Sequence, residues 1–168
     1  MSAFADGFIT KEEESMRKPY TQLYVHLVWA TWDRLPLLDH ALRPRVYRCI
    51  QREAFNLGCE VGAIGGIEDH VHVLVRCAPT VAVSNLVKQI KGSSSRLVQR
   101  ELRPGEFFKW QGSYGAFSIA ETHIEPVRRY IRRQEEHHRT GRLNATLERT
   151  FLDDAPGPAN SGSPPRTR

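Results

Sequence analysis

The chain contains few cysteines and no long apolar run. Its three cysteines, Cys49, Cys59 and Cys77, stand too far apart for the paired spacing of a zinc site. Their odd number and apolar neighbours indicate reduced thiols, as is usual in intracellular proteins. No stretch reaches the length of a membrane span, and residues 1–11 lack the basic-then-apolar pattern of a secretory signal. These absences predict a cytoplasmic protein with no membrane association.

The basic residues are concentrated in two stretches. The chain has 168 residues and 40% hydrophobic content, which is enough for one domain with a real core. Its formal net charge is +5. Residues 82–103 hold five basic side chains against Glu101 alone, and residues 123–142 hold six arginines against three glutamates. Two basic helices predict a polyanion partner, most simply nucleic acid, although two ordinary solvated helix faces would give the same pattern.

Hydrophobic periodicity divides the chain into alternating strands and helices. We expect strands at 23–31, 59–66, 70–77, 107–110 and 114–119, and helices at 40–57, 82–100 and 124–140. This order predicts an α+β, ferredoxin-like domain with an antiparallel sheet, helices on one face and an additional C-terminal helix. The domain would occupy residues 21–142, after a polar leader at 1–20. Residues 143–168 would form a tail that is largely disordered from about 153, where proline, glycine and serine prevail.

Two histidines alternate with valines within residues 68–75, in the first part of the strand predicted at 70–77. Side chains two positions apart on a strand share a face, so His70 and His72 would point one way and Val71 and Val73 the other. Two neutral imidazoles in this arrangement can bind one divalent ion. A single His-x-His pattern also occurs as a plain pair of exposed histidines, so the remaining ligand must come from elsewhere.

The last predicted helix offers that ligand. Tyr130 and Gln134 are four residues apart and would share a helical face, while Val127 and Ile131 belong to an adjoining apolar stripe that docks on the sheet. The amide oxygen of Gln134 is a reasonable third ligand for Mg²⁺ or Mn²⁺ beside two histidines.

Four pieces of sequence, in this order, resemble a known family. They are Tyr-Val-His-Leu-Val-Trp-Ala-Thr at 24–31, Asp-His-Val-His-Val-Leu at 69–74, Leu-Val-Lys-Gln-Ile-Lys-Gly-Ser-Ser at 86–94 and Tyr-Ile-Arg-Arg-Gln at 130–134. Together they resemble the single-tyrosine transposases of the His-hydrophobic-His (HUH) endonuclease superfamily, the IS200-like family that includes the REP-associated tyrosine transposases. The resemblance implies the same ferredoxin-like sheet, which is also that of RNA-recognition domains.

The resemblance also implies an activity and a set of residues. His70, His72 and Gln134 would bind Mg²⁺ or Mn²⁺, and Tyr130 would be the nucleophile that cleaves single-stranded DNA. The product would be a 5′-phosphotyrosine and a free 3′-hydroxyl, which can be rejoined without a nucleotide cofactor. The family further implies recognition of hairpin DNA and a homodimer in which the tyrosine helix can serve the partner's histidines. The candidate contacts with the DNA backbone are predicted from their positive charge alone: Lys88, Lys91, Arg96, Arg132 and Arg133.

Several alternatives remain open in the sequence. Tyr114, which follows a turn and precedes a glycine, is a rival nucleophile, and His26 is expected in the core or behind a ligand. His137 and His138 are expected at the surface, with a metal role for His137 left open. The chain could instead be a domesticated hairpin-binding regulator without transposition activity. An RNA-binding domain would need exposed aromatics on the central strands, and a two-histidine phosphodiesterase would need a second His-x-Ser/Thr motif.

Overall fold

A four-stranded antiparallel sheet forms the centre of the protein, with strand order β2-β3-β1-β4. The computed structural model describes residues 20–150. The strands are β1 (Tyr24–Ala30), β2 (Glu60–Gly66), β3 (His70–Arg76) and β4 (Gly115–Ile119). The helices are α2 (Arg43–Asn56), α3 (Val83–Leu97), α4 (Ile124–Arg132) and α5 (Gln134–Thr140), with short helical turns η1 (Trp32–Arg34), η2 (Val98–Leu102) and η3 (Glu121–His123). The predicted α+β, ferredoxin-like architecture is confirmed.

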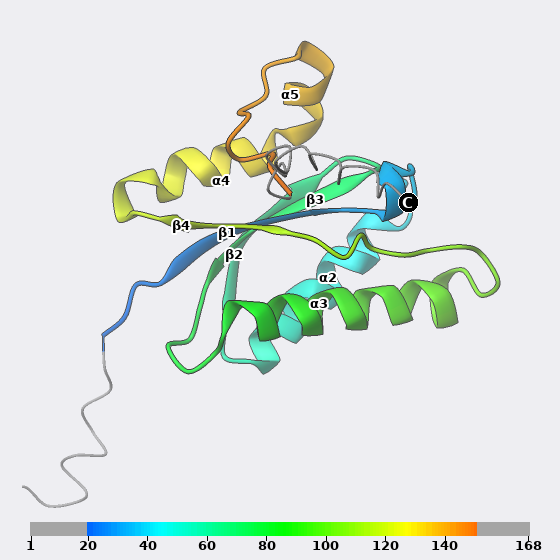
Figure 1. The fold of residues 1–168 in the computed structure, drawn as a ribbon, viewed down its shortest axis with the longest axis horizontal. Helices are drawn as coiled ribbons and strands as arrows, with labels where there is room; N and C mark the ends of the chain where they lie inside the picture. Colours follow the sequence, from blue (N-terminus) through cyan, green and yellow to red (C-terminus); the bar gives the residue numbers. More distant parts are fainter. Residues whose placement is uncertain (1–19, 151–168) are drawn as a thin grey trace, which may run out of the picture.

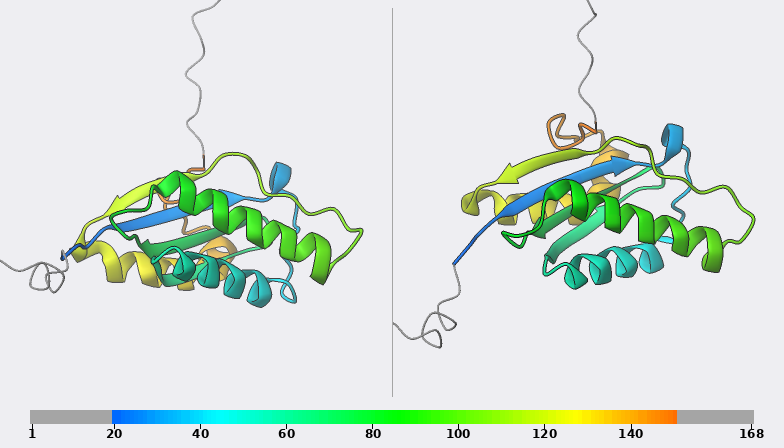
Figure 2. Two further views of the ribbon diagram at one scale, coloured as in Figure 1. Left: turned by 90° about the horizontal axis from the view of Figure 1, so that it is seen from below. Right: turned by 60° about the horizontal axis from the view of Figure 1, so that its bottom comes forward.

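The two faces of the sheet are covered by different helices. Helices α2 and α3 lie side by side under one face, while α4 lies against the other (Figures 1 and 2). The main core forms on the α2–α3 side and includes Leu27, Trp29 and Val73. A smaller apolar cluster, which includes Leu74 and Ile131, joins α4 to the opposite face. The alternation predicted for β3 is therefore confirmed, and its histidines lie on the α4 face.

The bounds of α2 follow from its flanking residues. The Asp39 carboxylate accepts hydrogen bonds from the backbone N–H groups of Ala41 and Leu42, both at 2.9 Å, which satisfies donors that a helix start leaves free. Pro44 occupies the first turn, where its missing N–H costs nothing. Gly58 follows the helix with φ +73°, a conformation that favours glycine. Asp39 therefore caps the turn that leads into α2, and Gly58 follows its last turn.

Glycines of β2 allow α4 to approach the sheet closely. The register of β2 against β3 shifts between Val61 and Ala63, so the strand is irregular at Gly62. A Cβ atom on Gly65 would lie only 2.1 Å from the backbone oxygen of Ile131. The backbone of α4 therefore rests directly on the backbone of β2, one residue after Tyr130.

The strand predicted at 107–110 is wrong. Of these residues, only Trp110 forms a β-bridge, an isolated one to Thr31. The Trp32 N–H donates to the Lys109 carbonyl and the Gln111 N–H to the Ala30 carbonyl on either side of it. The Trp110 indole N–H instead donates to the hydroxyl of Ser94, 3.0 Å away in the core. The Lys91 ammonium donates to the carbonyl oxygens of residues 111, 112 and 113 at 2.6–3.3 Å. Side chains of α3 and this one bridge, rather than a continuous backbone ladder, hold the segment in place.

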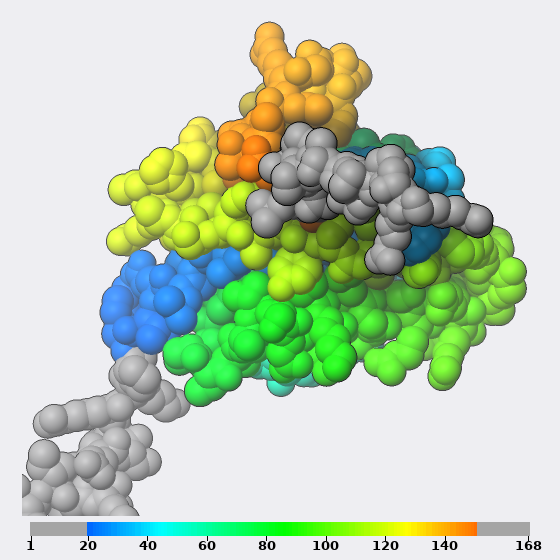
Figure 3. All heavy atoms as spheres, viewed as in Figure 1, coloured from blue at the N-terminus to red at the C-terminus, as the bar shows by residue number. Residues whose placement is uncertain are grey.

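The single helix predicted at 124–140 is also wrong, because the chain breaks at Arg133. That residue has φ −107° and ψ 22°, and α5 leaves in a new direction, so that it stands out from the body of the molecule (Figure 3). Neither proline nor glycine marks the break in the sequence. The break places Gln134 at the start of α5 with its side chain buried against β3.

Residues 141–150, which the sequence assigns mostly to a tail, fold back over the α4 face of the sheet. Leu147 packs against the smaller apolar cluster, and Thr150 is buried. A Cβ atom on Gly115 would lie 2.1 Å from the backbone oxygen of Arg149, so this glycine admits the returning chain. Residues 1–19 of the leader predicted at 1–20, and residues 151–168 of the tail predicted at 143–168, lie outside the described residues. Within residues 20–150, none of the helices combines the length and apolarity of a membrane span.

Candidate active site

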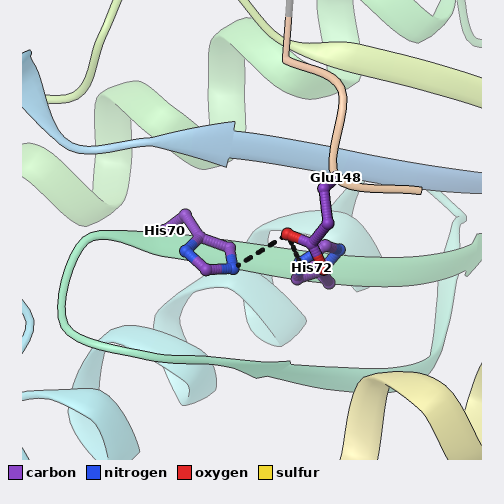
Figure 4. A group of neighbouring side chains, drawn as sticks. All are labelled: His70, His72 and Glu148. Atoms are coloured by element: carbon purple, nitrogen blue, oxygen red, sulfur yellow. Dashed lines mark ion pairs between the residues drawn. The ribbon is translucent and has the colours of Figure 1, made fainter. Parts of the chain in front are cut away.

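Two buried histidines and one carboxylate converge on the α4 face of β3. His70 and His72 are fully buried, and their Nε2 atoms lie 3.4 and 3.3 Å from the same oxygen, Oε2 of Glu148. Glu148 reaches them from the returning chain (Figure 4). One ligand atom from each of the three residues lies within 4.8 Å of the others. Two imidazole nitrogens and a carboxylate oxygen at this spacing can hold one divalent ion.

Each histidine is oriented through its other ring nitrogen. His70 donates from Nδ1 to Asp69 Oδ1 at 2.5 Å, and His72 Nδ1 lies 3.0 Å from Nε2 of His26. Burial alone would lower the pKa of His70, but Asp69 and Glu148 outweigh it and raise that pKa to about 9. Burial, and then the nearby His72, lower the pKa of His26 to about 3, so His26 is neutral. His26 thus lies behind a candidate ligand, as one reading of the sequence expected.

Gln134 lies beside the histidine pair despite the break in the helix. Its Oε1 atom is 3.3 Å from His70 Nε2, and its amide nitrogen donates to Glu148 Oε1 at 3.3 Å. The side chain is 1% exposed. The structure therefore brings Gln134 to the position where the sequence expected a neutral oxygen ligand.

The Tyr130 hydroxyl points into the same cluster. It donates to Glu148 Oε1 and accepts a hydrogen bond of 3.1 Å from the backbone N–H of Asn144. Its ring meets His72 edge-on, with centroids 6.0 Å apart. Burial, followed by the hydrogen bond to the Glu148 carboxylate, raises the pKa of Tyr130 to about 12. The phenol is therefore protonated at neutral pH.

Sequence reasoning missed two members of this cluster. Glu148 falls in the supposed tail, where a lone acid after Leu147 gave no motif. Burial tends to raise the pKa of Glu148, but its contacts with His70 and His72 hold it far below the usual range. His138 was expected at the surface, yet its ring centroid lies 4.8 Å from that of His70 and its Nε2 is 3.9 Å from Glu148 Oε2. The ring of His137, for which the sequence left a metal role open, stacks instead on the ring of Tyr130, with centroids 4.7 Å apart.

The cluster fits a bound cation. Among residues 20–150, the Nε2 atoms of His72 and His138 are buried and make no hydrogen bond of good geometry, although both face the Glu148 carboxylate. Buried nitrogens without partners are costly. A cation between the imidazoles and the carboxylate would satisfy them. Mixed nitrogen and oxygen donors suit Mn²⁺ better than Mg²⁺, which prefers oxygen alone.

The remaining predicted residues lie outside this cluster. Tyr114 packs against the main core on the α2–α3 side of the sheet, so it is remote from the histidines. Lys88, Arg96 and Arg132 are exposed, and Arg133 is exposed but paired with Glu136 at 2.8 Å. Lys91 uses its ammonium to hold the loop after Trp110.

Comparison with known proteins gives a consistent family. ISDra2 transposase TnpA of Deinococcus radiodurans is 27% identical over 122 residues, covering 68% of this chain and 86% of that protein. The crystal structure of a candidate transposase from Deinococcus radiodurans R1 has a TM-score of 0.53 and 26% identity, covering 70% of this chain and 95% of the other.

A more distant structure shares the fold. The REP-associated tyrosine transposase bound to a REP hairpin has a TM-score of 0.56 at 15% identity, covering 76% of this chain and 74% of that one. The family described as "Transposase IS200 like" matches residues 19–134, the stretch that carries β1–β4, the histidine pair, Tyr130 and Gln134. The chain belongs to the IS200-like transposase family.

Proposed function

We propose that this transposase cleaves and rejoins single-stranded DNA through a covalent link to Tyr130, with a divalent metal bound by the histidine pair. One observation carries the proposal: the two oxygens of Glu148 contact the Tyr130 hydroxyl on one side and the Nε2 atoms of His70 and His72 on the other. The tyrosine hydroxyl and the cation site are separated by only one carboxylate group. A single phosphodiester could therefore contact both of them.

The proposed reaction is a phosphoryl transfer to the phenol oxygen. Tyr130 Oη forms a bond to phosphorus while the bond from phosphorus to the 3′-oxygen of the preceding nucleotide breaks. The phenol loses its proton, and the leaving oxygen takes one up to become a 3′-hydroxyl. In the reverse direction a 3′-hydroxyl attacks the 5′-phosphotyrosine, so no ATP is consumed. Because the pKa of Tyr130 is about 12, the site must lower the cost of ionising the phenol when DNA binds.

His70, His72 and Glu148 would hold the metal, with Gln134 as a further oxygen ligand. A bound Mn²⁺ or Mg²⁺ supplies positive charge that polarises the phosphate and favours departure of the 3′-oxygen. Asp69 and His26 contact the Nδ1 atoms of His70 and His72 and so fix the orientation of the two rings toward the metal site. Asn144 holds the Tyr130 hydroxyl in place through its backbone N–H.

Hairpin DNA is the proposed substrate. Its support is the related protein bound to a REP hairpin, together with the exposed Lys88, Arg96 and Arg132 of this chain. Arg133 and Lys91 belong to the same proposal, although each is already engaged within the protein. The proposal also includes a homodimer and a cytoplasmic protein that associates with the bacterial nucleoid when it binds DNA.

A covalent-capture assay tests the nucleophile and the reaction class together. Single-stranded oligonucleotides from the flanks of the gene, which include any hairpins, would be incubated with the protein and Mn²⁺ or a chelator. We expect a metal-dependent protein–DNA adduct in wild type that is absent in Tyr130→Phe. Tyr114→Phe is the matched control and should keep the adduct. An adduct that persists in Tyr130→Phe would contradict the assignment, and hairpin binding with no adduct in wild type would indicate a DNA-binding regulator instead.

A further inference from the structure

A cavity opens beside Tyr130, over the end of β4. It encloses about 540 Å³, and Tyr130 is part of its wall. The floor comes from the end of β4, one side from α4 and the outer side from the returning chain. We call this cavity the flank pocket; its lining includes Phe117, Ile119, Ala120, Val127, Asn144 and Leu147.

The walls of the flank pocket are mostly apolar, with polar groups at exposed positions. Phe117, Ile119 and Leu147 are partly buried, and the Phe117 ring rests on His26 with centroids 5.8 Å apart. The side-chain oxygen of Asn144 accepts from the backbone N–H groups of residues 146 and 147, which leaves its amide nitrogen free to donate toward a ligand. None of the residues that line this cavity in the described structure is acidic, so a polyanion meets no like charge there.

The position of the flank pocket beside Tyr130 indicates which part of the DNA would bind in it. A strand whose phosphate lies at the Tyr130 hydroxyl must place the adjoining nucleoside within a few ångströms, and the cavity that shares Tyr130 is directly there. Apolar walls of ring size with a few polar donors are suited to a flat heteroaromatic ring. The volume of the cavity is within the range of ligand sites and is large enough for a base with its sugar.

We propose that the flank pocket binds the nucleobase next to the scissile phosphate, so that the protein itself selects or holds that base. This inference rests on the proposed function, because it takes single-stranded DNA at Tyr130 as its starting point. It assigns a binding role to Phe117 and Val127, which lie outside the proposed catalytic cluster, and to the side chain of Asn144, whose backbone N–H contacts the Tyr130 hydroxyl.

Two independent changes test the flank pocket, one in the DNA and one in the protein. Full-length Tyr130→Phe, which cannot cleave, would be titrated with single-stranded oligonucleotides that carry one abasic residue at each position in turn. We expect the abasic residue to weaken binding about tenfold at a nucleotide flanking the scissile bond and little at distant unpaired positions. Ala120→Trp in the same background would fill the cavity from an exposed position of extended backbone. It should weaken binding of intact DNA by a similar factor and remove the penalty of the abasic residue.

Ala116→Trp is the control, because Ala116 is exposed on the adjoining strand β4 but does not line the cavity. It should leave both affinities unchanged. The inference is overturned if flanking and distant abasic residues cost the same, if Ala120→Trp keeps the full penalty, or if Ala116→Trp weakens binding equally. It is also overturned if Ala120→Trp alters the oligomeric mass in light scattering without altering DNA affinity. The adduct assay could fail while an abasic residue still weakens binding selectively at one flanking nucleotide. That result would contradict the proposed Tyr130 chemistry but not the base-binding role of the flank pocket.

Discussion

The hydroxyl of Tyr130 donates its hydrogen to the carboxylate of Glu148, 18 residues further along the chain. The other carboxylate oxygen faces the Nε2 atoms of His70 and His72 at 3.4 and 3.3 Å. This carboxylate therefore connects the proposed nucleophile to the histidines of the candidate metal site. It also lies where a phosphate bound to both would have to fit, so its role can be decided by removing its charge.

Glu148→Gln keeps the size of the side chain and removes that charge. Because the carboxylate is one of three converging donors, we expect the affinity for Mn²⁺ to fall about tenfold or more and adduct formation to fall with it. The measurement is calorimetric titration with Mn²⁺ beside the adduct assay. Glu125→Gln, an exposed acid at the start of α4, should change neither. Faster adduct formation with unchanged Mn²⁺ affinity would show instead that Glu148 competes with the phosphate of the DNA.

Gly65→Ala should damage the site from a distance. The new Cβ would meet the backbone oxygen of Ile131 at 2.1 Å, so α4, which carries Tyr130, would have to move. We expect a loss of roughly 1–3 kcal/mol in the free energy of unfolding and a lower rate of adduct formation. Gly92→Ala, with open space around the new atom in the described structure, should instead stabilise α3 by about 1 kcal/mol. Equal behaviour of the two variants in urea denaturation would contradict the close approach.

His26→Phe should change how stability depends on pH. Since the pKa of His26 falls from 6.5 to about 3 on folding, the unfolded chain binds its proton first as pH drops. Wild type therefore loses stability from this group below about pH 6.5. The variant lacks this loss, although it gives up the contact with His72. Urea unfolding at pH 7.5 and pH 4.5 should show the variant's deficit shrinking at the lower pH. A deficit that stays constant would rule out a neutral, buried His26.

Lys88→Ala and Lys91→Ala should separate DNA binding from folding. Lys88 is exposed, so its removal should weaken single-stranded DNA binding and reduce the slope of log affinity against log salt by about one. Lys91 holds three carbonyl oxygens of the loop after Trp110. Its removal should mainly lower the free energy of unfolding, by about 1–3 kcal/mol. Fluorescence anisotropy at several salt concentrations and urea denaturation distinguish the two. A lower salt slope in Lys91→Ala alone would reverse these roles.

The parts of the fold that could be predicted depend on local pattern. The alternation of His70, Val71 and His72 fixed which face each side chain takes, because the period of a strand is two. Asp39 and Gly58 marked the ends of α2 through backbone hydrogen bonds and a positive φ, both of which act within a few residues. Tyr130 and Gln134 met at one site because their separation still spans one turn, even across the break at Arg133.

The parts that could not be predicted depend on contacts between distant residues. Glu148 reaches the histidines only because Gly115 admits the returning backbone and Leu147 packs on the sheet, and neither feature has a local signature. The segment around Trp110 has the composition of a strand, but a hydrogen bond to Ser94 decides its path. The same holds for His138, which comes to lie beside His70 only after α5 has changed direction.

The described structure gathers His70, His72, Tyr130, Gln134 and Glu148 within a single copy of the chain. This has a genetic consequence. If each site is built from one copy of the chain, two defective alleles, His70→Ala and Tyr130→Phe, would not complement each other when expressed in one cell. Complementation would show instead that Tyr130 of one copy serves the histidines of its partner.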